Sequence, residues 1–210
     1  MQAPRKLAQA VSYLLSPLVM PVAVTSIALS AAGASQHAIL TNGSVAFVAF
    51  FVIPLVGIVS LLVRGETASL DVPERPVRTR LFAVTFVAGV LGLLVCQSLD
   101  LETALVLPIM ASFVLILAAT AWINLFWKIS VHMIAISGAL AILLAVSTVL
   151  GPGGSWLRMP VIVPFLLLIP LVGWSRLYLR AHTIDQIVGG ALLGFFGHFA
   201  AILLLGSVIA

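Results

Sequence analysis

Residues 187–209, with the sequence IVGGALLGFFGHFAAILLLGSVI, form an apolar run that contains no charged side chain. A helix needs roughly 20 mostly apolar residues to cross a bilayer, and this run is long enough. Gly190, Gly194 and Gly197 lie at a spacing that lets a membrane helix pack closely against a neighbour. We therefore predict that the run is a membrane helix packed inside a bundle.

The rest of the chain has the same character. Of its 210 residues, 62% are hydrophobic and 8% are charged, whereas a soluble domain is about 45–50% apolar and about 25% charged. The mean hydropathy is +1.28. Since a closed β-barrel needs shorter, alternating segments, the composition predicts an all-α, polytopic integral membrane bundle. We expect one membrane domain, residues 1–210, with six to seven transmembrane helices in the apolar runs near 11–31, 44–64, 81–98, 103–125, 131–150, 159–174 and 187–209.

Two of these runs, 81–98 and 159–174, are short for a full span, and the second contains three prolines that favour a kink or a tilt. Counting the runs places the N-terminus and the loops near 64–80, 126–130 and 175–186 on one side of the membrane. That side holds every Lys and Arg of the chain except Arg158. The positive-inside rule makes it cytoplasmic. The formal charge of +4 is therefore interpreted as loops facing an anionic leaflet, and not as nucleic-acid binding.

Three polar groups lie at helix boundaries on this side. They read SRLYLRAHTIDQ at 175–186, KISVH at 128–132 and DVPERPVRTR at 71–80. Polar side chains are costly near a bilayer, so such clusters indicate a functional site. Arginine matches phosphate oxygens with two parallel hydrogen bonds, and histidine can attack phosphorus or protonate a leaving oxygen. The three groups together predict a phosphate site.

The spacing of Ser175-Arg176, five residues and then His182 resembles the third signature of the type 2 phosphatidic acid phosphatase superfamily, which is Ser-Arg, five residues, His, three residues, Asp. Ser130 and His132 keep the serine and histidine of its second signature, Pro-Ser-Gly-His. The arginine-rich segment 71–80 is similar to its first signature, Lys, six residues, Arg-Pro. The order of the three groups matches, over roughly residues 64–198.

This resemblance implies a metal-independent phosphatase, without a cofactor, that acts on a lipid or isoprenoid mono- or diphosphate in the bilayer. His182 would be the nucleophile and would form a phosphohistidine, and His132 would be the general acid. The side chains that would hold the phosphate are Arg176, Ser130, Ser175, Arg78 and Arg75. The flanking helices would admit the lipid tail from the side.

The chain departs from the family pattern at two important positions. The aspartate of the third signature falls at Gln186, with Asp185 one residue early, and either residue can reach His182 within one helical turn. If Arg78 is the arginine of the first signature, the lysine position is Asp71, which has the wrong sign for phosphate. If the pair Arg75-Pro76 is used instead, that position is Ala68. We favour Arg78, because Arg75 then lies one turn earlier and can replace the lost cation.

These departures motivate a second hypothesis, in which the chain keeps the fold and has lost the chemistry. Such a protein would be a structural or accessory subunit of a larger membrane complex. A transporter or channel is a weaker alternative, because no acidic residue lies in the middle of any apolar run.

Overall fold

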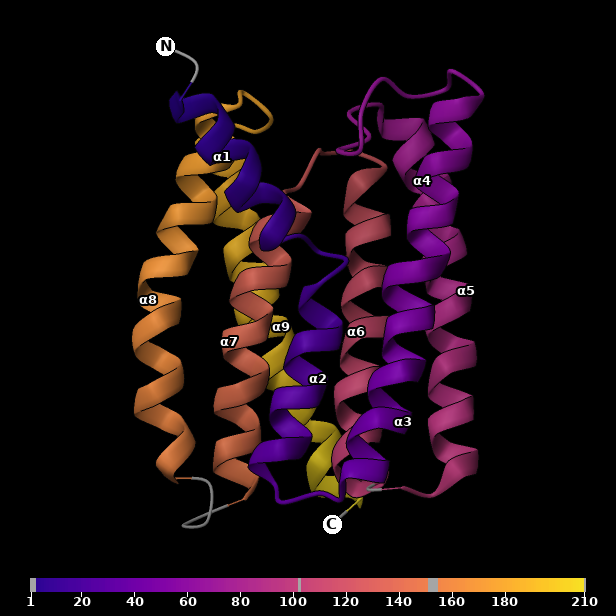
Figure 1. The fold of residues 1–210 in the computed structure, drawn as a ribbon, viewed down its shortest axis with the longest axis vertical. Helices are drawn as coiled ribbons and strands as arrows, with labels where there is room; N and C mark the ends of the chain where they lie inside the picture. Colours follow the sequence, from indigo (N-terminus) through magenta and orange to yellow (C-terminus); the bar gives the residue numbers. More distant parts are fainter. Residues whose placement is uncertain (1–2, 102, 151–154, 210) are drawn as a thin grey trace.

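The computed structural model describes residues 3–101, 103–150 and 155–209, and every regular element in these ranges is helical. The longer helices run side by side in a single bundle (Figure 1). The elements are α1 (Ala3–Leu14), α2 (Met20–Ala31), α3 (Gln36–Phe47), η1 (Val48–Val52), α4 (Ile53–Val63), α5 (Arg75–Leu99), α6 (Thr103–Asn124), α7 (Val131–Val149), α8 (Ser155–Tyr178) and α9 (Ile184–Ile209).

Five helices in the described ranges are long and apolar enough to cross a membrane. They cover Gln36–Val63, Arg75–Leu99, Ala104–Asn124, Val131–Val149 and Ile184–Gly206. The predicted all-helical, multi-pass membrane protein is therefore confirmed. Two shorter apolar helices, Met20–Ala31 and Val163–Tyr178, accompany them, and the count of six to seven spans stays a prediction.

The predicted first span, residues 11–31, is divided into two helices. α1 ends at Leu14 and α2 begins at Met20. Pro17 lies in the link, where its ring disfavours a helical conformation at the residue before it. Pro21 lies in the first turn of α2, a position where its missing N–H costs nothing. The two prolines therefore explain both the break and the restart.

The second span is longer than the sequence indicates, because it starts at Gln36 rather than near residue 44. Ser35 caps its first turn by accepting a hydrogen bond from the Ala38 N–H at 3.1 Å. Inside the span, η1 is a π-helical segment, and Pro54 lies in the first turn of α4, which follows it. Proline removes one hydrogen bond of the α-helical ladder, and a local π-bulge accommodates that loss.

The two runs predicted to be short both belong to longer helices. α5 extends back to Arg75, with Pro76 in its first turn, and therefore reaches 25 residues. α8 covers Ser155–Tyr178, and its internal prolines do not end it. The sequence underestimated both helices because polar or proline-containing turns at their ends interrupt the apolar run without breaking the backbone pattern.

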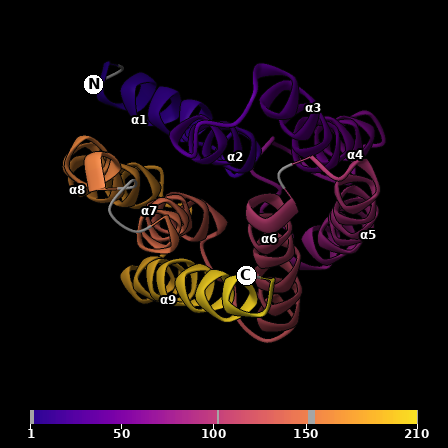
Figure 2. The ribbon, with the colours of Figure 1, turned by 90° about the horizontal axis from the view of Figure 1, so that it is seen from below.

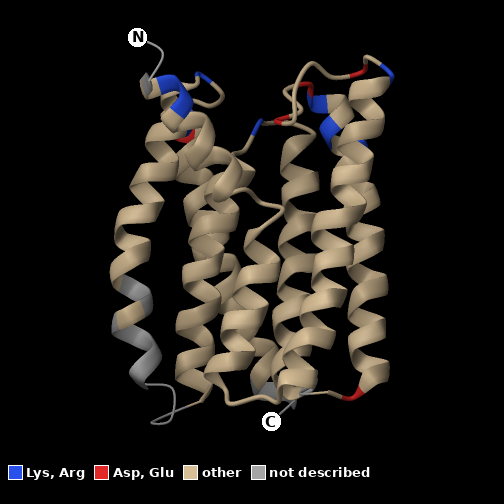
Figure 3. Ribbon diagram, viewed as in Figure 1, with Lys and Arg blue, Asp and Glu red and all other residues tan. Residues whose placement is uncertain are grey.

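The three polar groups converge on one end of the bundle, as the count of the runs predicted. Figure 1 places the N-terminus and the loops before α5, before α7 and before α9 at the same end. Lys and Arg gather there, whereas Asp100 lies at the opposite end (Figure 3). The side chain of Arg158, predicted at that opposite end, lies outside the described residues.

α7 is the central helix, with 78% of its spanning window buried against at most 50% for the other four candidate spans. It packs against α9, α8 and α2 (Figure 2). The predicted close packing through glycines is confirmed at the contact with α9. A Cβ atom at Gly190 would lie 2.6 Å from the Ser130 carbonyl oxygen, and one at Gly194 would lie 2.8 Å from the Ile134 Cα. These glycines bring the start of α9 against the start of α7.

Candidate active site

The turn between α8 and α9 sets the position of His182. Arg180 has a left-handed backbone, with φ of 52°. The Arg180 N–H donates to the Leu177 carbonyl at 2.9 Å and the Ala181 N–H donates to the Arg176 carbonyl at 3.0 Å. This pair of bonds is the Schellman ending of a helix, here with arginine where glycine is usual. It reverses the direction of the chain within three residues, so that His182 lies at the end of the bundle that carries the three polar groups.

The first turn of α9 fixes the orientation of the His182 ring. Thr183 precedes the helix, and Gln186 reaches back so that its Oε1 accepts from the Thr183 N–H at 3.4 Å, which is one of the two bonds of a capping box. The same Oε1 accepts from His182 Nδ1 at 2.9 Å. Asp185 instead accepts from the Thr183 hydroxyl. Of the two alternatives, Gln186 is therefore the partner of His182, and the imidazole carries its proton on Nδ1 and a lone pair on Nε2.

His182 is poised as a neutral base. Burial lowers the pKa of His182 to about 4, and the positive charges of Arg176, Arg78 and Lys128 add to the effect, while the hydrogen bond that His182 donates to Gln186 opposes it. At neutral pH the ring is therefore uncharged, and Nε2 is available as a nucleophile. The three cations that act on His182 come from all three polar groups.

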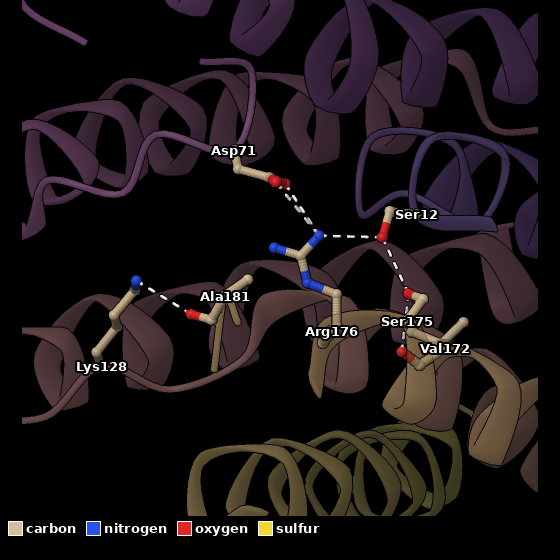
Figure 4. Close-up of polar contacts among 7 residues, drawn as sticks. All are labelled: Ser12, Asp71, Lys128, Val172, Ser175, Arg176 and Ala181. Carbon is tan, nitrogen blue, oxygen red and sulfur yellow. Dashed lines mark hydrogen bonds and ion pairs between the residues drawn. The ribbon is translucent and has the colours of Figure 1, made fainter. Parts of the chain in front are cut away.

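The loop before α7 is joined to the α8–α9 turn. Lys128 donates from Nζ to the Ala181 carbonyl at 3.2 Å (Figure 4), and the Ser130 N–H donates to the Gln186 carbonyl at 3.3 Å. Partial burial, with the charges of Arg78 and Arg176, lowers the pKa of Lys128. These bonds hold the segment of Ser130 and His132 next to the turn that carries His182.

Arg176 is the most enclosed cation of the site, with 2% of its side chain exposed. Its Nη1 pairs with Asp71 at 3.1 Å and donates to the Ser12 hydroxyl at 3.1 Å (Figure 4). Ser12 in turn contacts the Ser175 hydroxyl at 3.0 Å, and Ser175 donates to the Val172 carbonyl at 3.0 Å. The Ser175 hydroxyl, predicted to bind phosphate, is thus engaged in this chain of bonds.

Three buried polar atoms of the predicted site have no hydrogen-bond partner within the described part of the chain. They are Arg176 Nε, Ser130 Oγ and His132 Nδ1. A buried polar group without a partner is costly, so such atoms are rare unless a ligand satisfies them. His132 lies within electrostatic reach of Arg176, Asp71 and His182. Arg176 and His132 therefore belong to one cluster, and Ser130 lies two residues before His132 in the chain.

The two arginines of the first polar group differ. Arg78 is buried, donates from Nη2 to the Ile129 carbonyl at 3.1 Å and lies over the Phe82 ring at 5.5 Å. Arg75 is exposed and donates to the Asn124 and Leu125 carbonyls. These carbonyls end α6, so in this structure Arg75 caps a helix. Arg78 is thus the arginine that joins the site.

A cavity of about 370 Å³ opens beneath the cluster. Asp71, Arg78 and His132 are among its polar lining residues, and most of the lining is aromatic or aliphatic, as at Phe50 and Phe113. A water molecule occupies about 30 Å³ in the liquid, so the space suits roughly a dozen carbon-sized groups. Its chemistry matches an amphiphile with an anionic head.

Sequence reasoning missed two residues that contact Arg176. Ser12 belongs to the N-terminal helix and carries no motif that points to it. Asp71 is conspicuous in the sequence only as a residue of the wrong sign for phosphate, so its contact with Arg176 could not be predicted. Among the described residues no group of three His, Cys, Asp or Glu side chains could hold a metal ion. Comparison of the chain with known protein families, curated proteins and solved structures found no match, so the functional argument depends on the site itself.

Proposed function

We propose that this protein is a membrane lipid phosphatase that hydrolyses a lipid or isoprenoid phosphate through a phosphohistidine intermediate. One observation carries the proposal: Arg176 Nε, Ser130 Oγ and His132 Nδ1 are buried without partners, beside a neutral His182 and above an apolar cavity. A tetrahedral oxoanion with a lipid tail would satisfy these atoms together. The resemblance to the type 2 phosphatidic acid phosphatases supports the same assignment.

In the proposed reaction, Nε2 of His182 attacks phosphorus, and the bond from phosphorus to the lipid oxygen breaks. Arg176, Arg78 and Ser130 hold the other phosphate oxygens and stabilise the charge that develops on them. A phosphate dianion stabilises the imidazolium form of His132, which gives its proton to the leaving alkoxide. Water then attacks the phosphohistidine and gives a proton to the now neutral His132, the P–N bond breaks, and inorganic phosphate leaves, so that both histidines return to their starting states.

The test is phosphate release by the purified protein in detergent, with a chelator present, from phosphatidate, phosphatidylglycerophosphate and polyprenyl diphosphates. We expect turnover that vanadate inhibits and that His182→Asn abolishes. His37→Asn is the matched control, because His37 is exposed at the start of α3, at the opposite end of the bundle. Absence of release from every substrate would count decisively against the proposal.

We further propose that the end carrying the site is cytoplasmic, because the described Lys and Arg residues gather there (Figure 3). The two termini lie at opposite ends of the bundle (Figure 1). A fluorescent or enzymatic reporter fused to the C-terminus should therefore report the non-cytoplasmic side. A cytoplasmic signal from that fusion would reverse the assignment.

One observation favours a second function, that of a catalytically silent subunit of a membrane complex. Asp71 occupies the family's lysine position and pairs with Arg176, and a paired arginine can serve packing alone. In that case the protein should co-purify with other subunits at fixed stoichiometry, and His182→Asn should leave the complex and its function intact. Isolation as an active, self-sufficient enzyme would refute this second function.

A further inference from the structure

The hydrogen bonds of Arg176 use one side of the guanidinium and leave the other side open. Nη1 carries two N–H groups, and its two partners are Asp71 and Ser12. Nε and Nη2 have no bond to any described residue. In Figure 4, Nη2 points away from Asp71, to the side on which Lys128 lies. Since Nε and Nη2 form the edge that binds two phosphate oxygens in parallel, the open edge is the one a phosphate needs.

The Ser12 contact has a fixed direction. Ser175 donates its hydroxyl proton to the Val172 carbonyl at 3.0 Å, so it can only accept from Ser12. Ser12 therefore donates to Ser175 and presents a lone pair to Arg176. Each group therefore donates a hydrogen bond to the next one: Arg176 to Ser12, Ser12 to Ser175, and Ser175 to the Val172 carbonyl. Every hydroxyl in this chain is satisfied only when Nη1 points at Ser12.

A buried neighbour anchors the surface loop that carries Asp71. The next residue, Val72, has φ of 44°, a left-handed conformation that is unfavourable for a β-branched side chain. Val72 is nevertheless buried, with 2% exposed, and packs with Ile58 and Val77. This packing stabilises the strained backbone and fixes the direction of the Asp71 carboxylate toward Arg176.

We propose that Asp71 and Ser12 are positioning residues that hold Nη1 of Arg176, so that its Nε and Nη2 face the substrate phosphate. The inference rests on the proposed function, because it takes the ligand of Arg176 to be a phosphate. This role of Asp71 is the opposite of the one that its negative charge alone suggests. A carboxylate near an anion site should weaken phosphate binding, whereas a positioning carboxylate strengthens it by fixing the geometry of the arginine.

The experiment measures vanadate binding and the kcat and KM of phosphate release for a set of variants. Asp71→Ala removes the acceptor and should weaken vanadate binding and lower kcat/KM by about tenfold or more. Asp71→Asn keeps an acceptor oxygen without the charge and should lose less. Ser12→Ala tests the second partner from a different helix and should also weaken binding. Thermal unfolding of each variant in detergent confirms that it is folded.

Glu66→Gln is the matched control. It removes one carboxylate from the same loop, where Glu66 pairs with the exposed Arg80 at 2.9 Å, and it should leave vanadate affinity unchanged. If Asp71→Ala binds vanadate as tightly as the wild type or more tightly, Asp71 competes with phosphate and the positioning role is overturned. If the wild-type protein binds no vanadate at all, the phosphate site itself is refuted, and the positioning role with it.

Discussion

Replacing Gly190 by alanine should disable the site while leaving most of the fold intact. Gly190 lies in α9, where that helix crosses the start of α7. An added Cβ atom would lie 2.6 Å from the Ser130 carbonyl oxygen and 3.1 Å from the Met133 Cβ, whereas ordinary contacts begin at 3.4 Å. The first neighbour is backbone and cannot rotate away. α9 must therefore move from α7 by nearly 1 Å, and it carries Gln186 and the preceding His182 with it.

The cost to stability follows from two opposing effects. Overpacking of a tight contact costs about 1–3 kcal/mol, and alanine is favoured over glycine within a helix by about 1 kcal/mol. The net loss should be about 1 kcal/mol. Catalysis is more sensitive, because a displacement of about 1 Å between reacting groups can lower the rate by about 100-fold. Activity should therefore fall far more than stability.

The assay pairs thermal unfolding in detergent with phosphate release. Gly206→Ala is the control in the same helix, since its added Cβ would meet only Val149 Cγ2 at 3.8 Å, an ordinary contact. That variant should keep full activity and gain about 1 kcal/mol from helix propensity. If Gly190→Ala is as active as the control, the close approach of α9 to α7 does not set the geometry of the site, and our reasoning is refuted.

Three other predictions concern the segment around His182. The pKa of His182 is lowered from 6.5 to about 4 in the folded protein, so the unfolded chain takes up the proton first as the pH falls. The free energy of unfolding of the wild type should therefore fall relative to that of His182→Asn between pH 6.5 and pH 4. Parallel plots of unfolding free energy against pH for the two proteins would contradict this. Gln186→Leu removes the acceptor of His182 Nδ1 and should lower kcat by about 100-fold. Gln186→Asp keeps an acceptor and adds a charge that stabilises the phosphohistidine, so it should be the more active of the two variants. Equal rates for the two variants would exclude a role of Gln186 in orienting His182. Arg180→Gly relieves a left-handed backbone and should raise stability by about 1 kcal/mol in chemical unfolding, and a loss would show that the Arg180 side chain contributes more than the strain costs.

The helical bundle could be predicted because it depends on the lengths of the apolar runs. The end of the bundle at which each polar group lies could be predicted because it depends on how many apolar runs separate the groups. The run at 187–209 is a helix in the structure, and its glycines make the close contact that their spacing indicates. The break in the first run could not be predicted. A proline inside an apolar run is compatible with a kinked span or with a helix end, and only the packing of α1 against α8 decides between them.

The site was predicted as a set of residues but not as a set of bonds. Motif spacing brought Arg176 and His182 into one group, and the i+4 spacing included Gln186 among the partners of His182. Spacing contains no information about a contact such as Ser12 with Arg176, which are 164 residues apart. The pairing of Asp71 depends on the direction of a loop, and that direction follows from the buried Val72 next to it. Comparison with the first signature shows only that residue 71 is not a lysine.

The two departures from the family pattern compensate each other in charge. The family signatures supply a lysine, two arginines and an aspartate, and therefore a net of two positive charges. In this chain Arg78, Arg176 and Lys128 act on the nucleophile, and Asp71 is the carboxylate of the cluster, so the net charge is the same. In this chain the carboxylate lies in the loop that contacts Arg176 rather than beside His182, and the third cation lies in the segment before α7. A net of two positive charges neutralises a phosphate dianion. The charge balance of the cluster therefore agrees with the phosphatase that we propose.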